Sequence, residues 1–338
     1  MKLRIATRKS ALALAQTTMA ADAIVAANFV ANSAERGKCA AVGDDSLTYE
    51  LVSMTTEGDR RLDKSLASFG GKGVFIKELE IALLENRADI AIHSLKDMPA
   101  EVLPQFKLAA VLKREDPRDA FLSRGGAAGV RFMDLPAGAR VGTGSIRRIV
   151  QLKALRPDIE YVPIRGNIQT RIGKLAELDG VVLAAAGLKR MGLADQVTEY
   201  FSTEQVLPAS GQGILVIETL ADADSRNPEQ REGSSEISGN IAQILARVND
   251  VETFCVASAE MAYLKALNAG CQFPVASFAE FVGETAENLK IRGIYWDEKS
   301  EKLLRAEVAG TVDLSSADSV RQSKELGVAL AQEIKNQL

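Results

Sequence analysis

Residues 74–95 read VFIKELEIALLENRADIAIHSL, and this stretch decides the fold class. Ile76, Leu79 and Leu83 recur at spacings of three and four residues, which predicts an amphipathic helix over Val74–Glu85. The apolar run that follows predicts a buried strand over Asp89–Leu95. A helix that leads directly into a buried strand is typical of chains that lay helices over the faces of a sheet.

The same alternation of strand and helix continues on both sides of this stretch. Each predicted strand is short and apolar, and a turn with Gly or Ser leads from it into a helix. The pairs are Leu3–Ala6 with Ala11–Ala27, Arg140–Val141 with Ile146–Leu155, and Tyr161–Ile164 with Ile168–Leu178, and Val181–Ala186 is a further strand. This order predicts the α/β class, with mainly parallel sheets covered by helices.

The length of 338 residues predicts two or three domains at roughly 150 residues each. Ala221–Asn240 is rich in small and charged residues and is interpreted as an inter-domain linker, while Asn32–Ser46 and Gly125–Ala139 are expected to be loops. The elements expected after the linker are a helix over about Val251–Asn268, strands over Phe273–Phe281 and Leu289–Trp296, and a closing helix from about Ser316. They predict a separate α+β unit.

The composition excludes several classes of function. Lys and Arg number 41 against 45 for Asp and Glu, and the net charge of −4 offers no general attraction to nucleic acid or anionic membrane. No apolar run approaches the ~18 residues of a membrane span. The single histidine, His93, rules out a multi-histidine metal site, and we expect no metal. Three widely separated cysteines without a CxxC pair indicate a reducing cytoplasm.

The segment VGTGSIRR, residues 141–148, follows a predicted strand and opens a helix. It lacks the third glycine of a dinucleotide-binding fingerprint. Arg147 and Arg148 are unfavourable beside the positive end of that helix unless an anion binds there. Backbone N–H groups and the hydroxyls of Thr143 and Ser145 would complete such an anion site. The alternative is that both arginines extend into solvent.

Basic residues follow three other predicted strands. Arg8 follows the first strand, with Ser10 nearby. Arg165 and Arg171 follow Tyr161–Ile164, and Lys189 and Arg190 follow Val181–Ala186. Ligands of open α/β sheets bind at the carboxyl ends of the strands, and the planar guanidinium group pairs well with carboxylate or phosphate. The sequence therefore predicts a substrate that carries several carboxylates or phosphates.

Three further side chains are candidates for chemistry. Asp97 follows the strand Asp89–Leu95, where it could accept a hydrogen bond from a substrate N–H and stabilise a developing cation; the alternative is a capping or loop aspartate. His93 is interpreted as a buried, hydrogen-bonded histidine. Cys271, in a loop after a helix, is either a reactive thiol or a small apolar filler. Thr55–Gly73 is glycine-rich and is expected to be a mobile lid or an ordinary flexible connection.

Seven ordered blocks carry these residues. They are GGKGVFIKELEIALLENRADIAIHSLKDMP (70–99), REDPRDAF (114–121), VGTGSIRR (141–148), IRGNIQTR (164–171), AAAGLKRMGL (184–193), LPASGQG (207–213) and NAGCQFPVASFAE (268–280). Together they resemble the porphobilinogen deaminase (hydroxymethylbilane synthase) family. The resemblance implies two similar, doubly wound α/β domains like those of type 2 periplasmic binding proteins, and a smaller α+β C-terminal domain.

The resemblance also implies how the chain is divided. Domain 1 would comprise residues 1–113 and 212–232 and carry the catalytic aspartate. Domain 2 would comprise residues 114–211 and carry the arginine-rich anion sites. Domain 3 would comprise residues 233–338 and carry the cofactor-attachment cysteine.

The activity implied by the resemblance is that of a transferase in tetrapyrrole (haem) biosynthesis. Such an apoenzyme builds a dipyrromethane cofactor from its own substrate, porphobilinogen, and holds it by a thioether, here to Cys271. Four porphobilinogen units then add in turn, each losing ammonia to give an azafulvene-type cation that the terminal pyrrole attacks. Hydrolysis releases 1-hydroxymethylbilane. We expect a cytoplasmic monomer with no nucleic-acid or membrane partner.

The resemblance carries over residue by residue. Asp97 matches the catalytic aspartate, and Lys96 lies beside it. The positions that match cofactor- and substrate-binding residues are Arg8, Ser10, Lys72, Ser94, Thr143, Ser145, Arg147, Arg148, Arg165, Arg171, Arg190 and Gln212. Ser68, Gly144 and Val256 depart from the family pattern, which puts substrate affinity in question. The competing hypotheses are a non-catalytic carboxylate-binding protein and a homologue that elongates its product poorly.

Overall fold

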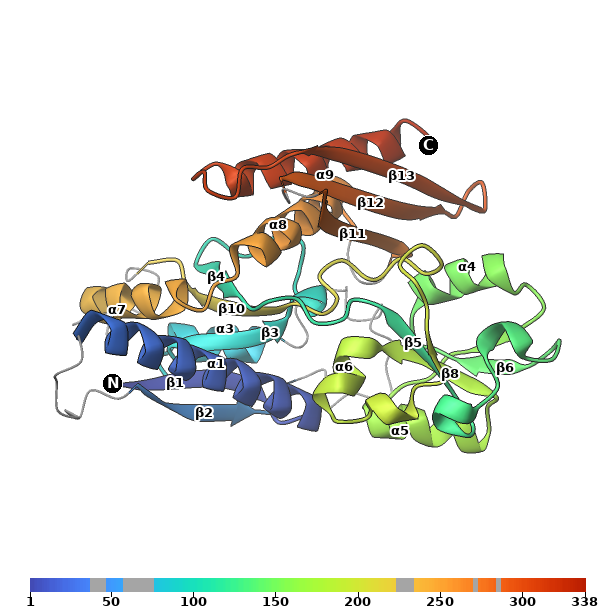
Figure 1. The fold of residues 1–338 in the computed structure, drawn as a ribbon, viewed down its shortest axis with the longest axis horizontal. Helices are drawn as coiled ribbons and strands as arrows, with labels where there is room; N and C mark the ends of the chain where they lie inside the picture. Colours follow the sequence, from blue (N-terminus) through green and yellow to red (C-terminus); the bar gives the residue numbers. More distant parts are fainter. Residues whose placement is uncertain (37–46, 57–75, 223–233, 270–272, 284–286) are drawn as a thin grey trace. The chain divides into compact units, whose positions relative to one another are not determined.

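The computed structural model describes residues 1–36, 47–56, 76–222, 234–269, 273–283 and 287–338. These residues form two compact units (Figure 1). Unit 1 is built from the described parts of Met1–Arg61, Gly73–Lys113 and Leu215–Phe254. Unit 2 is built from Arg114–Ile214 and the described parts of Cys255–Leu338.

Unit 1 contains a five-stranded sheet in the order β2-β1-β3-β10-β4. The strands are β1 (Lys2–Arg8), β2 (Thr48–Met54), β3 (Ile90–Ser94), β4 (Phe106–Val111) and β10 (Leu215–Leu220). β2, β1 and β3 are parallel, whereas β10 lies antiparallel between β3 and β4. Four of the five strands therefore run in the same direction, as the sequence predicts, and β10, which comes from a distant part of the chain, is the one antiparallel strand.

Helices cover both faces of this sheet. α1 (Ala11–Arg36) and α7 (Ser234–Ala246) share one core cluster with it, to which Leu3, Ile24 and Ile241 belong. α3 (Lys77–Leu84) packs on the other face, where Leu79 meets Ala6 and Ala91. Helices on both faces confirm the doubly wound arrangement.

Two expected boundaries differ from this arrangement. α1 continues to Arg36, so the start of the expected loop Asn32–Ser46 is helical. α7 contributes Ile241 and Leu245 to the core of unit 1, although we expected residues from 233 onward to belong to the third domain. Apolar residues spaced along α7 find their partners on α1 and β4, which the local pattern does not reveal.

Helix α1 contradicts the expectation that no apolar segment of the chain is long enough to span a membrane. Over Ala11–Ala31 it is long and apolar enough, by length and composition, to cross a membrane. Core helices meet the same criterion. Here Ala20, Ala21 and Ile24 of α1 are buried in the core of unit 1.

Unit 2 contains a second five-stranded sheet in the order β7-β6-β8-β5-β9. The strands are β5 (Asp119–Ser123), β6 (Arg140–Gly142), β7 (Glu160–Val162), β8 (Gly180–Ala184) and β9 (Glu199–Tyr200), and the helices are α4 (Ile146–Leu155), α5 (Ile168–Gly173) and α6 (Ala185–Arg190). β7, β6 and β8 are parallel, and β5 lies antiparallel between β8 and β9. The two sheets share one topology, with β5 and β10 in equivalent places.

A third, antiparallel sheet completes unit 2. It consists of β11 (Val275–Val282), β12 (Asn288–Asp297) and β13 (Lys302–Thr311). α8 (Val251–Ala266) and α9 (Ser319–Lys335) pack on it. Gly293 of β12 lies beneath Tyr263 of α8 and Leu330 of α9, where an added Cβ would clash with both side chains. Its α+β content is as expected, although this part belongs to unit 2 rather than forming a separate unit.

Candidate functional site

The carboxyl end of β3 presents Asp97. A 3₁₀ turn over Leu95–Asp97 follows the strand at once, and the buried side chains of Leu95 and Met98 hold it in place. Lys96 is half-buried and Asp97 is exposed. Within the described residues the Asp97 carboxylate has no hydrogen bond or ion pair. Among the described residues, the backbone alone therefore fixes Asp97, and its side chain is exposed.

Other predicted residues lie at the same edge of the unit 1 sheet. Arg8 ends β1, which is the parallel neighbour of β3, so the carboxyl ends of both strands point the same way. The Ser94 hydroxyl donates to Gln16 Oε1 at 3.2 Å. Ser10 precedes α1, and its Oγ accepts from the Ala13 N–H at 3.3 Å. Ser10 thus caps a helix here, a role that needs no ligand.

In unit 2 the carboxyl ends of β6 and β7 present the polar groups expected there. Thr143 is buried, and its Oγ1 accepts from the Ser145 N–H at 3.4 Å. Ser145 is the N-cap residue of α4, yet its own hydroxyl makes no capping bond. Arg165 is exposed, and Nε of Arg171 donates to the Gly166 carbonyl at 2.8 Å. The Ser145 hydroxyl is thus not committed to its helix.

Arg147 and Arg148 do not extend into solvent, which was one of the two alternatives. Both are buried, and both pair with the buried carboxylate of Asp119, at 2.8 and 2.7 Å. Nη1 of Arg147 donates to the Leu207 carbonyl (2.7 Å), and Nη1 of Arg148 donates to the Val182 carbonyl (2.9 Å). Asp119 thus supplies one protein counter-charge for the two guanidinium groups. The first turn of α4 points them inward because Asp119 of β5 lies there.

Gln212 belongs to the same cluster. Its Nε2 donates to Asp119 Oδ1 at 2.9 Å and to the Pro117 carbonyl at 2.7 Å. Burial opposes ionisation of Asp119, but the two guanidinium groups outweigh it and hold the pKa of Asp119 below its usual range. Burial also lowers the pKa of Arg147. Two cations sharing one carboxylate leave this interior cluster with one excess positive charge.

Arg190 is a second cation with little compensation. It ends α6, and its Nη2 donates to the Gly213 carbonyl at 2.6 Å. Burial lowers its pKa to about 10, and the neighbouring Glu115 opposes that shift only in part. Gly213 has φ +92°, and a Cβ there would meet the Glu115 carbonyl, so this position needs glycine.

These features fit an anionic cofactor. The Arg147–Arg148–Asp119 cluster carries excess positive charge, and the buried Nε of Arg148 has no hydrogen-bond partner in the described part of the chain. Cations that burial destabilises gain most from an added carboxylate. A pyrrole chain bearing acetate and propionate groups offers such carboxylates, and Thr143 and Ser145 offer hydroxyl donors at the same strand end.

Glu260 was not predicted as a candidate, although its carboxylate joins several segments of unit 2. It is buried on α8, and its carboxylate accepts from Arg114 Nη1 (2.6 Å), the Ala279 N–H (2.8 Å) and the Gly211 N–H (2.5 Å). The Arg114 guanidinium also lies 4.8 Å from the centroid of the Phe278 ring. The only local sequence signal was a glutamate among the apolar residues of a helix.

Some of the predicted residues lie outside the described part of the chain, and for others the structure shows only their burial or contacts. Lys72, Cys271, Ser68 and nearly all of the expected lid fall outside them. Val256 is buried within α8, and Gly144 is exposed in the turn before α4. Cys255 is a buried free thiol. His93 is buried and hydrogen-bonded to Glu218, as expected.

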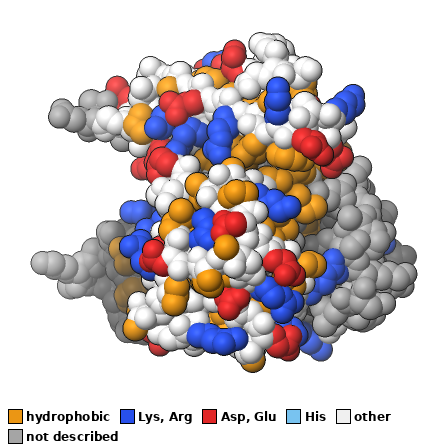
Figure 2. Space-filling view, turned by 90° about the vertical axis from the view of Figure 1, so that its right-hand side faces the viewer, with side chains coloured by type: hydrophobic (Ala, Val, Ile, Leu, Met, Phe, Trp, Pro, Cys, Tyr) orange, Lys and Arg blue, Asp and Glu red, His pale blue; other side chains and the backbone are white. Residues whose placement is uncertain are grey.

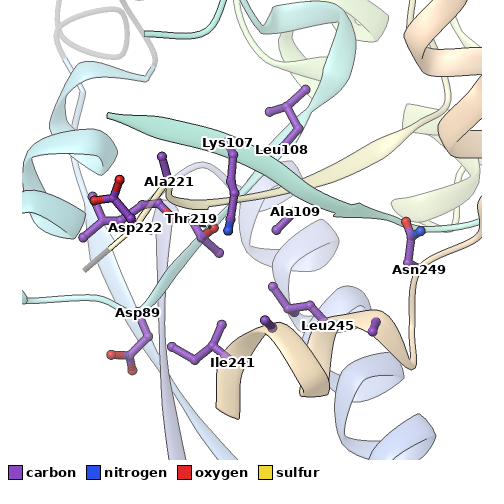
Figure 3. A pocket seen from close by; sticks show the side chains of 13 residues that line it. Asp89, Lys107, Leu108, Ala109, Thr219, Ala221, Asp222, Ile241, Leu245 and Asn249 are labelled. Atoms are coloured by element: carbon purple, nitrogen blue, oxygen red, sulfur yellow. Dashed lines mark hydrogen bonds between the residues drawn. The ribbon is translucent and has the colours of Figure 1, made fainter. Parts of the chain in front are cut away.

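A cavity of about 360 Å³ in unit 1 lies elsewhere. Figure 3 shows it between the sheet and α7, with Asp89, Lys107, Ile241 and Leu245 among its lining residues. Asp89 immediately precedes β3, whereas Asp97 follows that strand. The cavity therefore lies at the opposite end of β3 from the candidate catalytic residue, and no predicted site residue lines it.

Comparison with known proteins identifies the family. Residues 3–227 match the family model described as "Porphobilinogen deaminase, dipyromethane cofactor binding domain", and residues 254–336 match "Porphobilinogen deaminase, C-terminal domain". The chain belongs to the porphobilinogen deaminase family. The porphobilinogen deaminase of Syntrophus aciditrophicus is 43% identical over 98% of this chain and 94% of its own. That of Clostridium kluyveri is 43% identical over 92% and 93%.

Solved structures with a similar fold are more distant. DctP7, a Bordetella pertussis extracytoplasmic solute receptor, has a TM-score of 0.38 and 11% identity, covering 78% of this chain and 83% of its own. The ligand-binding component of an ABC-type import system from Staphylococcus aureus has a TM-score of 0.37 and 10% identity, covering 78% and 79%. The fold assignment rests instead on the strand orders described above.

The family membership confirms several predictions. The chain has the sequence of a tetrapyrrole-pathway transferase, and its larger matched region is a dipyrromethane cofactor-binding domain. The predicted α/β class with an α+β C-terminal part is also confirmed.

Proposed function

We propose that Asp97 is the catalytic residue of a porphobilinogen deaminase that condenses four porphobilinogen units head to tail and hydrolyses the product to 1-hydroxymethylbilane. The observation that carries this role is an exposed carboxylate, without protein partners in the described residues, at the carboxyl end of β3. An ionised carboxylate there accepts hydrogen bonds from pyrrole N–H groups. It also stabilises the positive charge that develops on the substrate as ammonia leaves.

The dipyrromethane cofactor supplies the nucleophilic terminal pyrrole to which the first substrate unit is joined. We propose that Cys271 holds it through a thioether. The carboxylates of cofactor and substrate would be bound by the residues that match the family's binding positions, with Lys96 beside Asp97. These are Arg8, Ser10, Lys72, Ser94, Thr143, Ser145, Arg147, Arg148, Arg165, Arg171, Arg190 and Gln212. The excess positive charge around Asp119 supports this assignment.

Asp97→Ala tests the catalytic role. We expect kcat to fall at least about 10²-fold, which is typical of removing a group that stabilises charge in the transition state. Asp22→Asn is the matched control, because Asp22 is an exposed aspartate of the same unit. Initial rates of product formation and the thermal melting temperature should be measured for both variants. A near-normal rate in a folded Asp97→Ala protein would disprove the role.

Intact mass spectrometry tests the attachment site. The purified protein should exceed its sequence mass by two deaminated porphobilinogen units, and Cys271→Ser should lack this excess. Cys255→Ser is the control, because Cys255 is a buried thiol in α8. If added porphobilinogen produced no adduct on the wild-type protein, the competing hypothesis of a non-catalytic carboxylate-binding protein would be favoured.

We further propose a cytoplasmic monomer that binds neither nucleic acid nor membrane. The net charge of −4 supports the absence of a nucleic-acid or anionic-membrane partner. On the face shown in Figure 2, basic and acidic side chains are interspersed rather than collected into one basic surface. Light scattering during size-exclusion chromatography should give a mass near 36.2 kDa.

A further inference from the structure

The cavity in unit 1 has no part in the mechanism proposed above. Its volume of about 360 Å³ falls within the range of about 300–1,000 Å³ that is usual for small-molecule sites. It lies between the edge strand β4, the end of β10 and helix α7 (Figure 3). Every residue that lines it is among the described residues, so its shape and charges can be read directly.

Small side chains keep this space open. Ala242 and Ala246 of α7 line the cavity, and Ala221 lines it after the end of β10. Ala109 of β4 lines it where the register against β10 shifts, so that Ala109 has no residue opposite. Such a bulge bends a strand and changes the direction of its side chains. Larger side chains at these positions would fill the space, as close packing does in most protein interiors.

The floor of the cavity is apolar. Ile241 and Leu245 of α7 line it, and both belong to the core cluster of unit 1, where they are 5% and 1% exposed. Leu108 and Leu220 add further aliphatic surface from the two strands. An apolar ligand that covers this surface is stabilised because the contact removes aliphatic groups from water.

One cation of the lining lacks a counter-charge. Lys107 is exposed on β4, opposite Thr219 in the register with β10. Figure 3 shows its side chain extending from β4 on the side where α7 lies. The ammonium group has no ion pair within the part of the chain that the structure describes. A carboxylate on a ligand can supply the missing charge.

The acidic residues of the lining are already engaged. Figure 3 shows Asp89 and Asp222 at one end of the cavity and Asn249 at the other. Arg4 donates to both oxygens of Asp89, at 2.6 and 3.2 Å, and Asp222 has an interaction of its own within the protein. Asn249 Oδ1 accepts from the Val111 N–H at 3.0 Å, which directs its amide nitrogen to act as a donor. The polar groups that remain available are therefore donors.

We propose that this cavity binds a small molecule with an apolar body and one carboxylate. The apolar body lies against Ile241 and Leu245, and the carboxylate pairs with Lys107. The inference goes beyond the proposed function and does not rest on it. The cavity lies at the opposite end of β3 from Asp97, and its occupation can be measured without turnover.

Octanoate is a suitable probe, because it joins an alkyl chain to one carboxylate. Isothermal titration calorimetry with the purified full-length protein measures its affinity. Lys107→Gln should weaken octanoate binding about tenfold, through loss of a charge-assisted contact. Lys113→Gln is the matched control and should bind like the wild type, because Lys113 is exposed in the same unit but does not line the cavity. Equal affinity in Lys107→Gln and the wild type would overturn the proposal.

Ala246→Leu tests the location. Ala246 is exposed at the cavity, so the larger side chain should occupy the binding space and leave the fold intact. We expect octanoate binding to be lost in this variant and retained in Ala26→Leu, which enlarges an exposed alanine of α1 outside the lining. Octanoate should also raise the melting temperature of the wild type and Ala26→Leu, but not of Ala246→Leu. Wild-type affinity in a folded Ala246→Leu protein would refute the site.

Two analogues test the sign of the charge. Octanol has the same alkyl chain without the carboxylate, so it should bind more weakly than octanoate and be insensitive to Lys107→Gln. Octylammonium carries the opposite charge and should bind more weakly still. Tighter binding of octylammonium than of octanoate would show that Asp89 and Asp222 govern the cavity, contrary to the proposal. Octanoate that gives no measurable binding at millimolar concentrations would also overturn it.

Discussion

Asp119 is buried between the guanidinium groups of Arg147 and Arg148, whereas Asp158 pairs with Arg156 at 2.6 Å near the surface. The two aspartates show how far burial changes the energetic consequence of an ion pair. Water reaches the Asp158 carboxylate, screens its pair with Arg156 and can replace Asp158 as a partner. Nothing can replace Asp119, because its two partners and Gln212 are all enclosed.

Asp119→Asn is therefore expected to destabilise the protein by about 3–5 kcal/mol, because it leaves two buried cations without a counter-charge. Asp158→Asn should cost no more than about 1 kcal/mol. Urea unfolding of both variants at neutral pH measures the difference. Equal midpoints would show that Asp119 does not stabilise the arginine pair.

The effect of pH on this cluster has a definite sign. Because folding lowers the pKa of Asp119, its contribution to stability is complete above the ordinary value of 3.8 and is lost as the pH falls toward the folded-state value. The unfolding free energy of the wild type should thus fall as acid is added below about pH 4. Asp119→Asn should lack this part of the acid dependence when both proteins are unfolded in urea at several pH values.

Among the elements, the turn between β6 and α4 combines a close backbone approach with the candidate anion site. A Cβ on Gly144 would lie 2.7 Å from the carbonyl oxygen of Ile164, which belongs to the segment after β7. The departure from the family pattern at Gly144 thus reflects a steric limit of this chain. Gly144 lets the two turns that carry Ser145 and Arg165 come together.

Gly144→Ser is expected to destabilise the protein by about 1–3 kcal/mol through overpacking. It should also raise KM rather than lower it, because the turn must move away from Ile164. Gly173→Ser is the control, since a Cβ at Gly173 meets nothing within 4 Å. Thermal melting and steady-state kinetics on porphobilinogen test both variants. A lower KM for Gly144→Ser would contradict this account.

For the molecule as a whole, Glu260 connects segments that are far apart in the sequence. From α8 it binds Arg114, the backbone of Gly211 and the backbone of Ala279 on β11. Arg114 lies between β4 and β5, and Gly211 lies between β9 and β10. One carboxylate therefore fixes both chain segments that lead between the two five-stranded sheets, together with the third sheet.

Glu260→Gln should cost about 3–5 kcal/mol of unfolding free energy, because the largely buried Arg114 guanidinium then loses the charge of the Glu260 carboxylate. Glu252→Gln, an exposed position in the first turn of α8, should be nearly neutral. Denaturant unfolding followed by circular dichroism compares them. A stable Glu260→Gln protein would show that packing against Phe278 suffices to hold Arg114.

The sequence by itself determined the elements whose signals are local. The periodicity of Ile76, Leu79 and Leu83 predicts α3, and the bounds expected for α4 agree with the structure. Asp97 follows β3 as expected, because a strand and the turn after it are encoded by adjacent residues. β13 was missed: its residues alternate between half-buried and exposed, so they do not form an apolar run.

Only the tertiary structure decided the pairings between distant segments. Asp119 and Gln212 are 93 residues apart, so no local pattern shows that the arginines of α4 turn inward to meet them. The antiparallel placement of β10 and the assignment of α7 to unit 1 arise in the same way. The spacing of residues along a helix or strand shows on which face a side chain lies. The partner that it meets there depends on the packing of distant segments, because burying a charge is favourable only where the fold supplies its counter-charge.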